Sequence, residues 1–241
     1  MCRTGASGIA REEVRLAPTT ARIPADLGFD ESPLGDGRQP IMANYIRAGF
    51  YTFKPGTFDP LIEKSRQELP QLMQRQPGFL RYAVVRTGSD SIASLTAWET
   101  RAQSETAAQQ LMGWVRENFG TDLVSAENKI GAVILSDWSS GTRQPGWGRV
   151  HDYTFSRPVA EIIPAVREGY LPLLQQQPGF NSYTVWQTAD DACTSYLTFD
   201  SREQGETALA AAMPWLQEHI VPDTKQVQRL GGELVWTVRN Q

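Results

Sequence analysis

The chain has 241 residues, of which 40% are hydrophobic and 21% are charged, a composition typical of a globular protein that buries a core. Its net charge is −4 at pH 7 and no run of three Lys or Arg occurs, which excludes the basic surface of a nucleic-acid binder. The sequence contains neither an apolar stretch of about 20 residues nor a secretion signal, so we expect a cytoplasmic protein without a membrane partner. Of the two cysteines, Cys2 lies near the start and Cys193 in a predicted strand, and we expect no disulfide.

Residues 76–117 recur as residues 177–218, and this repeat is the main feature of the sequence. Aligned without a gap, 17 of 42 positions are identical, among them the Gln-Pro-Gly-Phe run that opens each copy. A repeat of this length indicates two copies of a whole small domain. We therefore predict a first domain at 42–138, a linker at 139–147 and a second domain at 148–241.

Residues 1–41 have no counterpart in the second copy. They mix charge, proline and glycine without sustained apolar periodicity, which favours a disordered extension. The foldable pattern begins directly after Met42. A second interpretation is therefore that Met42 is the natural start and that the preceding residues are not native.

Each copy begins with a strand and an amphipathic helix. Residues 45–53 are rich in β-branched and aromatic residues, which predicts the strand. The helix carries one apolar stripe at three- and four-residue steps, formed by Phe58, Leu61, Ile62, Ser65, Leu69, Leu72 and Met73. The second copy repeats the stripe with Val159, Ile162, Ile163, Val166, Tyr170, Leu173 and Leu174. Because Pro70 and Pro172 lie inside this pattern, we expect a kink or an early break there.

A hairpin follows, and a last strand ends each copy. Residues 78–87 and 91–99 are strand-like runs joined by a Gly-Ser-Asp turn. Neither face of the first run is polar, which is typical of a sheet covered on both sides. One parity holds Leu80, Tyr82 and Val84, and the other holds Phe79, Ala83 and Val85. The last strand is predicted at 129–137 and again at 231–239.

A second helix precedes each last strand. Thr100 with Gln103, and Ser201 with Gln204, have the spacing of a capping box, whose side chains satisfy the first free amides of a helix. In the first copy this helix is predicted over 101–118.

The resulting order, β-α-β-β-α-β, is that of a ferredoxin-like domain, an α+β fold. Its sheet carries both helices on one face, so the other face needs a cover. We predict that the sheets of the two copies pack face to face and form one barrel with the four helices outside.

Three features point to a known family: the order of elements, the Gln-Pro-Gly-Phe entry into the second strand, and a third strand that ends in Ala97-Trp98-Glu99-Thr100 before a helix. They resemble the antibiotic-biosynthesis-monooxygenase domain of the dimeric α/β barrel superfamily. The resemblance covers residues 43–138 and 148–240. Members of the family usually build the barrel from two chains, so this chain resembles a fused dimer.

The resemblance also implies functions. The family includes cofactor-free oxygenases of aromatic polyketides, haem-degrading enzymes and proteins without known activity. In the oxygenases the substrate phenol is deprotonated, the carbanion reduces O2, and polar side chains hold the oxyanion. The implied function is a cofactor-independent monooxygenase that acts on a small aromatic or quinone-type compound. The alternatives are a non-catalytic small-molecule-binding or structural barrel protein, and an isomerase or decarboxylase on the same scaffold.

His151 is the first candidate for a catalytic residue, and aligning the opening strands places it opposite Gly49. A histidine can titrate near neutrality, which suits proton abstraction from a phenol. The alternative is a hydrogen-bonded or exposed strand histidine. Arginines on a sheet face can hold an anionic substrate, or they can form salt bridges between the sheets. The substrate-binding candidates on the parity of His151 are Arg47, Tyr51, Arg149 and Tyr153.

Trp98 and Arg86 are further catalytic candidates. Tyr82, Tyr183 and Trp186 are further candidates for substrate binding. These side chains line a pocket between sheet and helices in one interpretation and form an ordinary aromatic core in the other.

Chemistry is expected where the two copies differ. The differing pairs are Gly49/His151, Val85/Trp186, Arg86/Gln187 and Trp98/Phe199. Because Trp186 and Trp236 replace Val85 and Leu135, we expect a bulkier second half with a filled cavity.

The sequence does not predict a metal site. His151 and His219 are the two histidines, and no zinc-binding spacing or cysteine cluster is present. We expect no cofactor and a small aromatic molecule as the partner. The expected state is a monomer with an internal pseudo-dimer, and a further homodimer stays open.

Overall fold

Each half of the chain has the order of elements that the sequence predicts. The structure, a computed structural model, describes residues 44–138 and 145–240, so the predicted extension 1–41 and most of the predicted linker lie outside it. The first half contains β1 (Tyr45–Phe53), α1 (Phe58–Gln74), β2 (Phe79–Arg86), β3 (Ser91–Trp98), α2 (Arg101–Phe119) and β4 (Leu123–Trp138). The second half contains β5 (Trp147–Phe155), α3 (Val159–Ala165), η1 (Val166–Tyr170), α4 (Leu171–Gln175), β6 (Phe180–Ala189), β7 (Ala192–Phe199), α5 (Arg202–His219), η2 (Val221–Asp223) and β8 (Thr224–Arg239).

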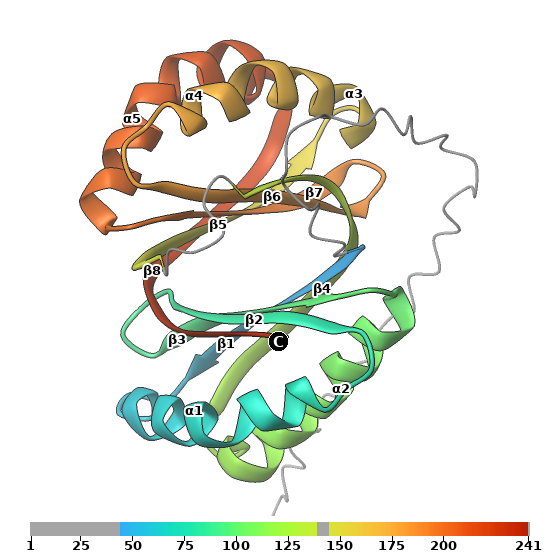
Figure 1. The fold of residues 1–241 in the computed structure, drawn as a ribbon, viewed down its shortest axis with the longest axis vertical. Helices are drawn as coiled ribbons and strands as arrows, with labels where there is room; N and C mark the ends of the chain where they lie inside the picture. Colours follow the sequence, from blue (N-terminus) through green and yellow to red (C-terminus); the bar gives the residue numbers. More distant parts are fainter. Residues whose placement is uncertain (1–43, 139–144, 241) are drawn as a thin grey trace, which may run out of the picture. The chain divides into compact units, whose positions relative to one another are not determined.

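The eight strands form one closed barrel in the order β1-β3-β2-β8-β5-β7-β6-β4, and every neighbouring pair is antiparallel. Helices α1 and α2 cover one side of the barrel, and α3, α4 and α5 cover the other (Figure 1). The predicted fold, two ferredoxin-like units that share a barrel, is confirmed. All described residues belong to one compact unit, Gln39–Gln241.

Two long strands close the barrel. Strands β4 and β8 each have 16 residues, whereas the sequence predicts only their later parts as strands. The first part of β8 pairs with β5 in its own half, and its last part, from Leu234, pairs with β2 in the other half. Strand β4 does the same with β1 and β6. In Figure 1 the dark red end of β8 accordingly lies beside β2. This exchange leaves neither sheet with an unpaired edge.

The exchanged strand ends also complete the core of the opposite half. Trp236 of β8 is buried in the core under α1 and α2, where its ring meets Tyr82 edge-on at 4.6 Å and its Nε1 donates to Ser65 Oγ at 3.2 Å. Leu135 of β4 lies in the core of the second half. The expectation that Trp236 fills the second half is therefore wrong, because the crossing strand carries it into the first.

The barrel interior is a third, separate core. It is built from Ile46, Ala48, Ala83, Val85, Ala93, Leu95, Val150, Trp186, Tyr196 and Leu234. A register shift between Phe79 and Arg81 modifies the strict alternation that the sequence suggests for β2. As a result, Phe79 faces the helices together with Tyr82 instead of facing the interior.

The helices follow the sequence with two local differences. Helix α1 continues through Pro70, whereas in the second half a π-helical segment, η1, ends just before Pro172. A wider turn relieves the clash between the proline ring and the preceding turn. The capping box of Thr100 and Gln103 is complete, whereas Ser201 Oγ accepts from the Gln204 backbone amide and donates to Gln204 Oε1 at 3.2 Å. No helix in the described ranges has the length and apolarity needed to cross a membrane.

Replacing Trp236 should destabilise both halves together, because its strand is hydrogen-bonded to both. We expect Trp236→Ala to lower the free energy of unfolding by about 3–5 kcal/mol through the cavity that it leaves. Urea unfolding followed by circular dichroism should still show one transition. Glu233→Ala, at an exposed position of the same strand, is the control and should change stability by less than about 0.5 kcal/mol. Two separate transitions in the Trp236→Ala variant would contradict this coupling.

Candidate functional site

A pocket on the helix side of the second half contains His151, and we call it the His151 pocket. It lies between β5, α5 and the start of β8, and its volume is about 260 Å³. This is close to the lower end of ligand sites, roughly 300 Å³. Its lining residues are Arg149, His151, Tyr153, Leu209, Met213, Leu216, Ile220, Val221, Thr224, Lys225, Gln226, Val227 and Arg229.

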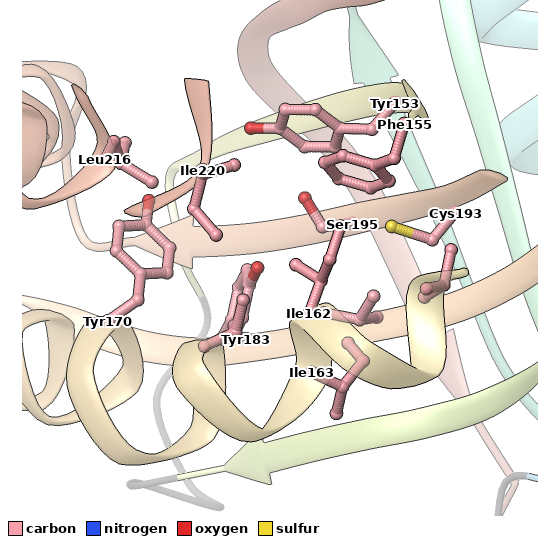
Figure 2. A pocket seen from close by; sticks show the side chains of 13 residues that line it. Tyr153, Phe155, Ile162, Ile163, Tyr170, Tyr183, Cys193, Ser195, Leu216 and Ile220 are labelled. Carbon is pink, nitrogen blue, oxygen red and sulfur yellow. The ribbon is translucent and has the colours of Figure 1, made fainter. Parts of the chain in front are cut away.

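A second, smaller pocket adjoins the first, and we call it the tyrosine pocket (Figure 2). It shares Tyr153, Leu216 and Ile220 with the His151 pocket. Its volume of about 20 Å³ has room for about one water molecule. In Figure 2 the hydroxyl groups of Tyr153, Tyr170, Tyr183 and Ser195 lie around this space. Its remaining lining residues are Phe155, Val159, Ile162, Ile163, Val166, Val185 and Cys193.

His151 is buried but has no hydrogen-bond partner among the described residues. Its side chain is 5% exposed, and its ring lies 5.7 Å from the ring of Tyr153. Burial, together with the nearby charges of Arg149 and Arg229, lowers the pKa of His151 to about 3. The imidazole is therefore neutral at physiological pH, and a ring nitrogen can accept a hydrogen bond or a proton from a ligand.

The phenols beside His151 stay protonated. Burial raises the pKa of Tyr153, Tyr170 and Tyr183 above the ordinary value. Burial also raises the pKa of the Cys193 thiol to about 12. Because these groups are neutral donors, the two pockets together offer hydroxyl groups to an oxyanion and a neutral imidazole to a proton.

In the first half, Arg47 fills the corresponding place. Its guanidinium is fully buried and donates from Nε to Asn128 Oδ1 at 2.8 Å, and from one terminal nitrogen to Ser94 Oγ at 3.0 Å. The other terminal nitrogen donates to the Tyr51 hydroxyl. Ser94 Oγ in turn donates to the Tyr82 hydroxyl at 2.9 Å. A small pocket of about 20 Å³ remains beside Tyr51, Tyr82 and Ser94.

Two sequence differences explain why the second half is open. A Cβ atom at Gly49 would collide with the guanidinium of Arg47, so His151, at the equivalent position, excludes this arginine conformation. Gly49 pairs with Asn128 across β1 and β4, whereas His151 pairs with Arg229 across β5 and β8. The acceptor that holds Arg47 is thus replaced by a second cation.

The side chain of Arg149 consequently adopts a different position from that of Arg47. Its guanidinium lies 5.5 Å from the ring centre of Trp147, and its Nε is buried without a hydrogen-bond partner among the described residues. Ser195, the counterpart of Ser94, lies beside the Tyr183 hydroxyl and partly offsets the rise of the Tyr183 pKa that burial causes. Arg149 and His151 thus keep polar groups that a ligand can bind.

The structure groups seven of the ten candidates and places the other three elsewhere. Arg149, His151, Tyr153 and Tyr183 line the two pockets of the second half, and Arg47, Tyr51 and Tyr82 meet in the first. Arg86 lies over the Phe58 ring at 3.9 Å and donates to Gly88 and Ser89 carbonyls. Trp98 packs edge-on against Phe79, and Trp186 lies in the barrel interior.

Sequence reasoning missed several pocket residues. Tyr170 belongs to the apolar helix stripe and gives no separate signal. Arg229 and Lys225 precede the predicted last strand, and only the longer β8 brings them beside β5. Met213 of α5 is 37% exposed at the His151 pocket. Within residues 44–138 and 145–240, no three His, Cys, Asp or Glu side chains are grouped as metal ligands.

The low pKa of His151 should make stability depend on pH. The unfolded chain binds a proton near pH 6.5, whereas the folded protein binds it only near pH 3, so stability is lost as the pH falls between these values. Between pH 7 and 4.5 the wild type should lose about 2–3 kcal/mol more than His151→Gln, measured by urea unfolding. Carboxylates contribute equally to both proteins. Equal losses would show that folded His151 takes up its proton at an ordinary pH.

Gly49→Ala should destabilise the first half, because its Cβ displaces the buried Arg47 from its acceptors. We expect a loss of about 2–4 kcal/mol in unfolding free energy. Gly113→Ala is the matched control, since a Cβ there meets nothing within 4 Å in helix α2 and alanine favours helices. Thermal unfolding compares the two variants, and a stable Gly49→Ala protein would show that the Arg47 network contributes little.

Residues 44–110 match the family described as antibiotic biosynthesis monooxygenase. No curated protein sequence matches the chain significantly. Among solved structures, one named a putative monooxygenase from Fusobacterium nucleatum has a TM-score of 0.64 at 8% identity, covering 82% of this chain and 94% of its own.

Two further structures are similar. One, named a putative monooxygenase from Lactobacillus acidophilus, has a TM-score of 0.63 at 7% identity and covers 81% of this chain and 96% of its own. The other, named an anthrone oxidase-like protein, has a TM-score of 0.56 at 14% identity and covers 82% and 93%. At these identities the structures show the fold alone. The family model matches residues 44–110, and the solved structures add that the chain shares their barrel fold.

Proposed function

We propose that this protein is a cofactor-independent monooxygenase acting on a small aromatic or quinone-type compound, and that the reaction takes place in the His151 pocket. One observation carries the proposal. In one half a buried histidine without a partner among the described residues faces a pocket that the phenol of Tyr153 also lines, while the other half fills the same place with Arg47. The antibiotic biosynthesis monooxygenase domain and the similar anthrone oxidase-like protein support the class of reaction.

The chemistry needs no external reductant. A ring CH2 group of an anthrone-type substrate loses a proton, and the resulting carbanion supplies the electrons that reduce O2. The oxygen then bonds to the same carbon as a hydroperoxide. Breaking its O–O bond, with loss of the second hydrogen of that carbon, gives a ketone and one water, so CH2 plus O2 becomes C=O plus H2O.

His151 is the proposed base. A pKa of about 3 makes free His151 a weak base. Proton transfer, however, leaves an anionic substrate next to the new imidazolium, and this attraction raises the pKa of His151 while the substrate is bound. The hydroxyl group of Tyr153, which lines both pockets, is the donor for the developing oxyanion.

The main alternative is a non-catalytic small-molecule-binding or structural barrel protein. It is favoured by the filled first half and by the small volume of the tyrosine pocket, about 20 Å³. A protein of this kind would bind aromatic compounds in the His151 pocket without consuming O2.

Oxygen uptake tests the proposal directly. Purified, metal-free protein is mixed with anthrone or polyphenols under air, and O2 consumption and product formation are followed. His151→Gln should lower turnover by about 10²-fold or more, the usual contribution of a general base. His219→Gln, at an exposed position near the end of α5, is the matched control and should keep the wild-type rate.

The outcomes separate the two functions. Binding of the compounds without O2 uptake would support the binding protein. O2 uptake at an unchanged rate in His151→Gln would remove His151 from the chemistry. Folding of each variant is checked by its circular dichroism spectrum and melting temperature.

A further inference from the structure

We infer that the His151 pocket takes an aromatic acid, whose carboxylate lies between Arg149 and Arg229 at the pocket mouth and whose ring lies against α5. The inference names the substrate class of the proposed site and rests on the proposed function only for the position of that site. It is carried by three observations: the charges of the lining, the apolar walls, and the contrast with the first half.

The charged side chains that line the pocket are all cationic. Arg149, Lys225 and Arg229 are among the lining residues, and none of the lining residues is an Asp or Glu. Lys225 has a distant carboxylate partner, with 3.6 Å between its Nζ and Asp191 Oδ2. Arg229 has no ion pair or hydrogen bond among the described residues, and the buried Arg149 Nε has no partner there. An anion is the ligand that such a lining favours.

The walls of the pocket are apolar, and part of them is exposed. Of the three large hydrophobic side chains that are exposed in the described part of the chain, two, Met213 and Val221, line this pocket. Leu216 and Ile220 continue this surface inward to the tyrosine pocket. A ring that covers Met213 and Val221 would remove both from water.

The depth of these residues orients the ligand. Arg229 and Lys225 are exposed, whereas His151 and Ile220 are buried. The charged head of a ligand therefore remains near the mouth, and its ring points inward to Tyr153, the residue shared by both pockets. This direction places the reacting ring beside the phenol groups.

In the first half the protein itself supplies the hydrogen-bond acceptors of the equivalent arginine. Arg47 finds its acceptors inside the protein, at Asn128 Oδ1 and at Ser94. In the second half Arg229 stands at the position of Asn128, so the internal acceptor is replaced by a cation. A carboxylate from outside supplies the acceptor that Asn128 supplies in the first half, and a guanidinium binds it with two parallel hydrogen bonds.

A matched pair of ligands tests the inference. Binding of 2-naphthoate and of its neutral amide, 2-naphthamide, is measured by isothermal titration calorimetry without O2. We expect the carboxylate to bind at least about 10-fold more tightly at low salt, and this preference to shrink as salt screens the arginine charges. Equal affinities for the two compounds, or no binding of either, would overturn the inference.

Variants of the two arginines locate the carboxylate. Arg229→Gln and Arg149→Gln should each weaken naphthoate binding about 10-fold and leave naphthamide binding nearly unchanged. Arg167→Gln, on the exposed side of η1, removes the same charge away from the pocket and should change neither affinity. If all three variants weaken naphthoate equally, the preference reflects net charge alone and the assigned carboxylate position is wrong.

The binding assay is independent of turnover. Selective binding of naphthoate without any O2 uptake by aromatic acids would sink the proposed oxygenase and leave this inference standing. Conversely, efficient oxidation of neutral anthrones by a protein that does not prefer the carboxylate would leave the oxygenase standing and overturn the inference.

Discussion

The exchange of β4 and β8 between the halves is the constraint on which the rest of the structure depends. Each long strand is hydrogen-bonded to its own half first and to the other half afterwards, which closes the barrel and leaves neither sheet with an open edge. The same exchange carries Trp236 under the helices of the first half and Leu135 under those of the second. Neither half therefore has a complete core without the other.

Within this nearly symmetric frame, two side-chain differences separate a filled site from an open one. Glycine at position 49 leaves room for the Arg47 guanidinium, which the protein satisfies with its own acceptors. Histidine at position 151 occupies that room, and Arg229 removes the acceptor. A buried polar group without a partner costs stability. A ligand that binds these groups of the second half supplies the missing partners. Duplication thus allows one half to serve stability while the other half keeps a pocket.

Much of this could be read from the sequence. The repeat, the apolar stripes and the capping box at Thr100 predict the elements and their order, because these are local patterns. The pair Gly49/His151 was also visible in the alignment. Other site residues were not visible. Arg229 pairs with His151 only because β8 begins earlier than its apolar part, and Phe79 changes face through a register shift that leaves no mark in the alternation.

The sequence by itself determined two ferredoxin-like units and a barrel between them, since periodicity and turn residues act over neighbouring positions. Only the tertiary structure decided which half has the larger pocket. The expectation of a filled second half counted Trp186 and Trp236 as bulk within that half, but one lies in the barrel interior and the other crosses into the first half. The core in which a side chain is buried depends on strand pairing between distant segments. The free energy of that pairing is distributed over the whole barrel, so no single stretch of sequence determines it.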